Sequence, residues 1–284
     1  MTEQTPPIGT AEPKTPINTV PGSMVHIGIV AKYTFLDYLR SRRFVIMILF
    51  AVIISALLTF LVAHYRPAAL LDTTLDFYST WWGSFASILA VFSGVAFGGD
   101  AIAGEFQNKT GYFTVSNPIR RSSFYVGKFV ASFIASTVVI AVYLALAVIN
   151  GLYYFGANIP YQLGESFLFA WFYLLAILGF TFMFSSLFKN SSYAILLSAV
   201  LLIIGFSIIS GVLEAVANIE PWFILSYGGG IVSDVLMQPY PTTSTRFGVT
   251  TYAPTVPEGL IIMGAYFIVA SILGLTIFER KEFN

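Results

Sequence analysis

Long apolar runs alternate with shorter polar segments along this chain of 284 residues. A helix needs roughly 20 apolar residues to cross a bilayer core of about 30 Å, and each run comes close to that length or exceeds it. None of the runs contains Asp, Glu, Lys, Arg or His in its interior. The pattern therefore predicts an all-α membrane protein with six transmembrane helices, at residues 44–63, 81–99, 129–154, 167–188, 194–212 and 260–278.

The basic residues fall almost entirely on one side of these six spans. If the N-terminus is cytoplasmic, the segments on that side carry twelve of the 14 Lys and Arg residues, and the outer segments carry only Arg66 and Arg246. Basic loops stay in the cytoplasm during insertion, so this bias orients the chain. We expect a multi-pass protein of the cell (plasma) membrane with both termini cytoplasmic.

The chain before the first span has two parts. Residues 1–23 are rich in Pro and Thr and have no apolar core, which predicts a disordered cytoplasmic tail. Residues 24–43 mix apolar and basic residues and predict an N-terminal helix lying in the membrane interface. Its basic cluster, Arg40, Arg42 and Arg43, would reach the lipid headgroups. An anchor that only fixes topology would explain the same cluster.

The loop between the second and third spans, residues 100–128, concentrates charge in a chain that otherwise avoids it. Projected as a helix, Ile102, Phe106 and Phe113 fall on one side, which predicts a short amphipathic helix. Pro118 would end it, and Arg120 and Arg121 would form a basic corner. Such an element is either a connector that packs on its own chain or a helix that docks into a groove of a soluble partner.

The residues of this loop resemble the signature of type-2 ABC transporter permeases, the ABC exporter family. The sequence reads D-x-x-x-x-E, then K-T-G-Y-F-T-V-S-N-P-I-R-R, then G-K at the opening of the third span. The matching positions are Glu105, Thr110, Pro118, Ile119, Arg121, Gly127 and Lys128. One position departs from the pattern, because Lys109 stands where the family usually has glycine and Gly111 follows the threonine instead.

The resemblance implies that the loop is a cytoplasmic coupling helix that docks into a cleft of a separate ABC ATP-binding subunit. Glu105 would hold this helix to the interfacial helix and the second span, with the basic residues of the interfacial helix as candidate partners. ATP and Mg would bind to the partner subunit, and the chain itself would need no cofactor. A second permease chain, identical or related, would complete the exporter. The docking residues would be Glu105, Phe106, Lys109, Thr110, Phe113, Pro118, Arg120 and Arg121.

The segment before the sixth span, residues 213–259, also divides in two. Its first half is apolar, aromatic and interrupted by glycine, and it is too short to span the membrane. The resemblance implies re-entrant helices here, which the composition permits because buried backbone can be satisfied by neighbouring helices. The second half is rich in Pro and Thr and predicts an exposed extracellular loop.

The remaining chemistry argues against an enzyme. The Gly-Lys pair at 127–128 lacks the other residues of a P-loop. Asp100 has no second aspartate within a span, as an intramembrane aspartyl protease would require. His26 and His64 fall on opposite sides of the membrane and there is no cysteine, so we expect no metal site. Because the net charge is zero, we expect that the chain does not bind nucleic acid. A non-transporting scaffold, or an immunity or assembly subunit with the same fold, stays open as the alternative.

Overall fold

The computed structural model describes residues 22–67, 71–109, 120–246 and 249–281. Within these ranges six helices are long and apolar enough to cross a membrane. The predicted all-α, six-span fold is confirmed, with spans at Arg42–Tyr65, Thr74–Gln107, Arg121–Phe155, Tyr161–Leu187, Ser191–Ala217 and Val256–Arg280. Three predicted docking residues, Thr110, Phe113 and Pro118, lie outside the described residues, as does most of the predicted tail.

Four spans are single helices and two are composite. The single helices are α2 (Arg42–Tyr65), α8 (Arg121–Phe155), α9 (Tyr161–Leu187) and α14 (Val256–Arg280). The second span joins α4 (Thr74–Tyr78), the π-helical turn η1 (Ser79–Gly83), α5 (Ser84–Gly98) and α6 (Ala103–Gln107). The fifth joins α10 (Ser191–Val200), η2 (Leu201–Gly205), α11 (Phe206–Val212) and η3 (Leu213–Ala217).

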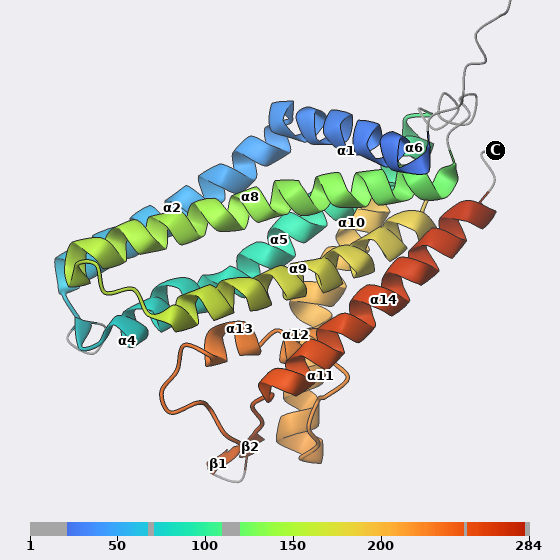
Figure 1. The fold of residues 1–284 in the computed structure, drawn as a ribbon. Coiled ribbons are helices and arrows are strands. Elements are labelled where there is room, and N and C mark those ends of the chain that lie inside the picture. Colours follow the sequence, from blue (N-terminus) through green and yellow to red (C-terminus); the bar gives the residue numbers. More distant parts are fainter. Residues whose placement is uncertain (1–21, 68–70, 110–119, 247–248, 282–284) are drawn as a thin grey trace, which may run out of the picture.

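Helix α9 lies at the centre of the bundle, with α5, α8 and α14 packed around it (Figure 1). A small residue permits a close approach, because a Cβ on Gly94 in α5 would lie only 2.5 Å from Ile177 in α9. Near the opposite end of α5, the buried Trp82 indole donates a hydrogen bond to Ser166 Oγ at 2.8 Å. Since a buried indole N–H needs an acceptor, this contact fixes the register between the second and fourth spans.

Helix α1 (Ser23–Arg40) is shorter than the predicted interfacial helix. Ser41 adopts an extended conformation, and its side chain caps the next helix by accepting a hydrogen bond from the Phe44 amide at 3.3 Å. The cap breaks the segment after Arg40, because an N-cap residue does not have helical dihedral angles. As a result, Arg42 and Arg43 lie in the first turn of α2, and only Arg40 belongs to α1.

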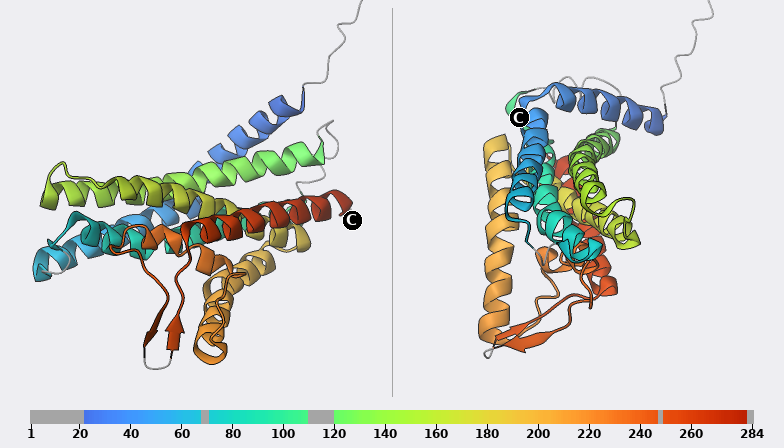
Figure 2. Two further views of the ribbon diagram at one scale, coloured as in Figure 1. Left: turned by 60° about the horizontal axis from the view of Figure 1, so that its bottom comes forward. Right: turned by 90° about the vertical axis from the view of Figure 1, so that its left-hand side faces the viewer.

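The fifth span leans away from the other helices (Figure 2). It is the least buried of the six spans. Its exposed face includes the branched apolar side chains of Ile203, Ile204, Ile208 and Val212. The helix continues past Val212 through η3, so Glu214 lies inside this element. Hydropathy alone predicts that the span ends before Glu214.

The segment between the fifth and sixth spans carries two short helices and one hairpin. Helices α12 (Leu225–Gly228) and α13 (Ile231–Asp234) pack against α14 and α9. Strands β1 (Ser244–Arg246) and β2 (Val249–Thr251) pair antiparallel, with Ser244 opposite Thr251. The sequence predicted only an exposed loop at the hairpin, because three-residue strands without apolar alternation carry little signal.

Candidate functional site

The short helix α6 is pinned to the turn that joins α9 and α10. Ser185 Oγ, on α9, accepts hydrogen bonds from the amides of Ile102 and Ala103, each at 2.9 Å. On the other side of α6, Gln107 Oε1 accepts a hydrogen bond from the Ser191 amide at 2.7 Å. These bonds satisfy first-turn amides of α6 and of α10, which would otherwise have no intrahelical partner. The charged loop therefore leaves the second span in a fixed orientation.

Glu105 forms an ion pair with Lys128 in α8. The Lys128 ammonium also donates to the Ala101 carbonyl at 2.8 Å, so it bridges both ends of the turn that leads into α6. The Lys128 side chain is only 12% exposed and the Glu105 side chain only 18%. This corrects the expectation that a basic residue of the interfacial helix pairs with Glu105. The sequence singled out Lys128 as part of the Gly-Lys signature without giving it this role.

The three arginines of the basic cluster near the start of the first span differ in their contacts. Arg43 forms an ion pair with Asp100, at the end of α5. Arg40 and Arg42 are exposed to solvent. Arg43 is the member that connects the cluster to the second span, and it does so from α2 and not from the interfacial helix.

Tyr38 joins three helices at this end of the bundle, a contact that no local sequence pattern indicates. Its hydroxyl donates to the Phe97 carbonyl at 2.9 Å and lies 3.1 Å from Ser132 Oγ. Burial, reinforced by the negative charge of Asp100, raises the pKa of the Tyr38 hydroxyl well above its usual value. The hydroxyl therefore stays neutral and remains a hydrogen-bond donor that ties α1 to α5 and α8.

The other predicted docking residues lie around α6 in different settings. Phe106 is partly buried, with its ring edge-on to Phe278 of α14 at 6.3 Å between centroids. Arg121 donates hydrogen bonds to the carbonyls of Glu279 and Lys281, each at 2.9 Å. Arg120 is exposed at the N-cap of α8.

Lys109 has a backbone conformation that its residue type disfavours. Its φ angle is 57°, in the left-handed region where a Cβ costs free energy and glycine does not. This is the position at which the resemblance expects glycine. The chain therefore keeps the left-handed turn after α6 and places an exposed cation on it.

A cleft of about 540 Å³ with both apolar and charged side chains in its lining opens between α1 and α6. Carboxylates, an ammonium group and tyrosine side chains line it, among them Tyr33, Asp37, Tyr38, Asp100, Glu105 and Lys128. Helix α1 forms one wall by packing closely on α8, since a Cβ on Gly127 would lie 2.7 Å from Val30. In the part of the chain that the structure describes, no group of three or more His, Cys, Asp or Glu residues could hold a metal ion.

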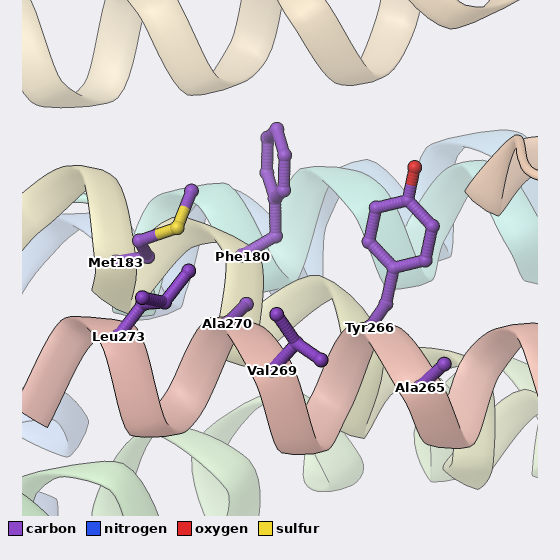
Figure 3. Close-up of a pocket in the computed structure, with 7 residues that line it drawn as sticks. All are labelled: Phe180, Met183, Ala265, Tyr266, Val269, Ala270 and Leu273. Carbon is purple, nitrogen blue, oxygen red and sulfur yellow. The ribbon is translucent and has the colours of Figure 1, made fainter.

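Further hollows lie along the spans in the described part of the chain. One, of about 290 Å³ between α9 and α14, is lined by apolar side chains and Tyr266 (Figure 3). Two others, of about 450 and 360 Å³, share Ser87 of α5 and Ser226 of α12. The smaller of this pair is lined mainly by serine and glycine, which makes it an uncharged polar surface next to α12 and α13.

The comparisons with known proteins agree with this arrangement. No curated protein matches the chain. The family described as "ABC-2 family transporter protein" matches residues 29–283, which include all six spans and the α6 segment. The chain belongs to the ABC-2 transporter family, as a membrane-spanning subunit.

Proposed function

We propose that this chain is the permease of an ATP-driven exporter and that its α6 end receives a separate ABC ATP-binding subunit. The observation that carries the proposal is the ion pair between Glu105 and Lys128, which ties the charged loop to the third span. A docking helix passes on a partner's movement only if it moves together with the spans. The two Ser185 bonds and the Gln107 bond support the same rigid connection to the fourth and fifth spans.

The energy source lies outside this chain. ATP and Mg bind to the partner subunit, since the sequence has no P-loop and the Gly-Lys pair at 127–128 lies inside helix α8. No ionisable residue lies in the interior of the predicted apolar runs, whereas a proton-coupled carrier normally needs one. Both features favour a permease without enzymatic activity of its own.

A second permease chain covers the exposed face of the fifth span. This span is the least buried of the six, and its outward side chains are branched and apolar. The larger of the two hollows that share Ser87 and Ser226 lies where α5 and the fifth span meet α12, and its lining is mostly apolar with three serines. The smaller hollow continues towards α13 and is lined mainly by serine and glycine. This combination suits a path for an amphipathic substrate without a charged headgroup. The distribution of Lys and Arg supports cytoplasmic termini, and the six spans support a location in the cell membrane.

Purification of the tagged chain from its own membrane in mild detergent, with identification of the co-purifying proteins, tests this function. A stoichiometric ABC ATP-binding subunit, and ATP-dependent movement of a substrate when the complex is placed in vesicles, are the expected results. An intact complex without such a subunit would overturn the proposal and favour a non-transporting scaffold. Co-purification with ATP hydrolysis but no transport of any substrate would favour an immunity or assembly role.

A further inference from the structure

The C-terminal end of α14 crosses the candidate site. We call residues 278–281 the C-terminal strap. Lys281 Nζ donates hydrogen bonds to three successive carbonyls at the end of α9: those of Ser186 at 2.8 Å, Leu187 at 3.2 Å and Phe188 at 2.8 Å. The last carbonyls of a helix have no intrahelical partner, and an ammonium group has three N–H donors. Lys281, which directly follows α14, therefore caps the C-terminal end of α9.

The same ammonium also contacts the coupling segment. Lys281 Nζ lies 4.4 Å from the centroid of the Phe106 ring in α6. A cation over an aromatic face is attracted by the ring quadrupole, and more strongly when it is shielded from water. Lys281 is thus held between the end of α9 on one side and α6 on the other.

The backbone of the strap is held as well. The Arg121 guanidinium donates to the carbonyls of Glu279 and Lys281, each at 2.9 Å, from the first turn of α8. The Phe278 ring is stacked on Phe124 of α8 at 6.3 Å and edge-on to Phe106 at 6.3 Å. The strap consequently contacts α6, α8 and α9 within four residues of sequence.

At its other end α14 packs against the short helices before it. A Cβ on Gly259 would lie 2.8 Å from the Gly228 carbonyl of α12 and 2.6 Å from Ile231 of α13. Tyr266 donates a hydrogen bond to the Phe223 carbonyl at 2.9 Å. One helix therefore contacts α6 at one end of the bundle and α12 and α13 at the opposite end (Figure 1).

We propose that the C-terminal strap clamps α6 against α9, that Lys281 is the positioning residue of this clamp, and that α14 carries a displacement of α6 to α12 and α13. The second half of this inference rests on the proposed function, because it requires a partner that moves α6. The first half depends only on the contacts of Lys281. Its chemistry is the capping of α9 carbonyls by an ammonium group that also rests on the Phe106 ring.

Hydrogen exchange with mass spectrometry on the purified full chain tests the clamp. Lys281→Met keeps the length of the side chain and removes the ammonium. We expect exchange of the amides at 102–108 to become about fivefold faster, since α6 loses the attraction between the ammonium and the Phe106 ring. Lys281→Arg keeps the positive charge and should restore part of the protection. Lys189→Met removes a neighbouring exposed cation that no described contact joins to α6, and it should not increase exchange.

The coupling half of the inference needs the complex with its ATP-binding subunit in vesicles. Lys281→Met should lower the amount of substrate moved per ATP hydrolysed, while Lys189→Met should not. Unchanged exchange at 102–108 in Lys281→Met would overturn the clamp. Faster exchange with normal coupling would overturn the part played by α14 in transmission. If no ATP-binding subunit is found, the proposed function fails, yet the exchange measurement still decides the clamp.

Discussion

The Glu105 carboxylate on α6 and the Lys128 ammonium on α8 form an ion pair across 23 positions of sequence. Both side chains are largely shielded from water. Removing one partner of such a pair leaves a charge that is poorly solvated, which costs more than the pair itself contributes. The pair therefore acts as a constraint on where α6 sits relative to the third span, and this constraint is open to direct tests.

Glu105→Ala should leave membrane insertion intact and uncouple ATP hydrolysis from transport. Without the carboxylate, Lys128 keeps its hydrogen bond to the Ala101 carbonyl but loses its ion pair, so α6 is held less firmly to α8. We expect transport per ATP hydrolysed to fall by about fivefold or more, since coupling effects start at about that size. The measurement is substrate uptake and phosphate release in the same vesicles. The exchanged pair Glu105→Lys with Lys128→Glu should recover part of the loss, and normal coupling in Glu105→Ala would contradict the role given to this residue.

Arg43→Gln should weaken the connection between the first and second spans, whereas Arg40→Gln and Arg42→Gln should not. Only Arg43 pairs with an acidic residue, Asp100, among the contacts of this cluster that the structure describes. Because the Arg43 side chain is 47% exposed, the loss of stability should not exceed about 1 kcal/mol. Thermal unfolding of the three variants in one detergent compares them, and an equal loss in all three would argue for a general effect of positive charge.

The six spans could be predicted because each sums the hydropathy of about 20 residues, so single exceptions do not alter the result. The partner of Glu105 could not be predicted, because several basic residues look alike in the sequence and only the packing of the helices decides which one lies near Glu105. These residues are Arg40, Arg42, Arg43 and Lys128. Lys281 was counted only as part of the inside positive charge. Its carbonyl partners lie 93 to 95 positions earlier, beyond the reach of any local pattern.

The predicted helix boundaries differ from those of the structure where a single polar side chain decides where a helix ends. Ser41 ends α1 and starts α2 through one hydrogen bond. In the sequence, a serine that caps a helix cannot be told from any other serine in a basic segment. Glu214 was placed outside the fifth span because a charge normally ends an apolar run. The helix nevertheless continues to Ala217, since its backbone hydrogen bonds do not depend on the polarity of its exposed side chains.

Gly259→Ala should destabilise the protein, and Gly264→Ala should not, although both glycines lie in α14. A Cβ at Gly259 would meet the Gly228 carbonyl at 2.8 Å, and a backbone atom cannot move aside as a flexible side chain can. A Cβ at Gly264 would meet no atom within 4 Å. We expect a loss of about 1–3 kcal/mol for the first change. The second should be neutral or stabilising by up to about 1 kcal/mol.

Thermal unfolding in detergent measures the difference between the two glycine variants. Hydrogen exchange at residues 225–234 should also increase in Gly259→Ala alone, because the added Cβ would push against Gly228 of α12 and Ile231 of α13. Equal unfolding temperatures would contradict the close approach of α14 to α12, and with it the contact through which α14 is proposed to act.

The last prediction concerns pH and the Lys281 ammonium. Burial, together with the nearby positive charge of Lys189, lowers the pKa of Lys281 from its ordinary value of 10.5 to about 8. Between these two values the unfolded chain binds the proton and the folded chain does not, so the free energy of unfolding rises with pH in this window. Below about pH 8 both states are protonated and the contribution of Lys281 to the pH dependence disappears.

The unfolding temperature of the native chain minus that of Lys281→Met should therefore increase from pH 8 towards pH 10 and stay constant from pH 6 to pH 8. Subtracting the variant removes the contribution of the tyrosines that titrate in the same range. Lys189→Met should move the start of the increase to higher pH, because it removes a repulsive charge and so raises the pKa of Lys281. A flat difference across the whole range would mean that the three carbonyl hydrogen bonds offset the desolvation of the ammonium, and it would contradict the lowered pKa of Lys281.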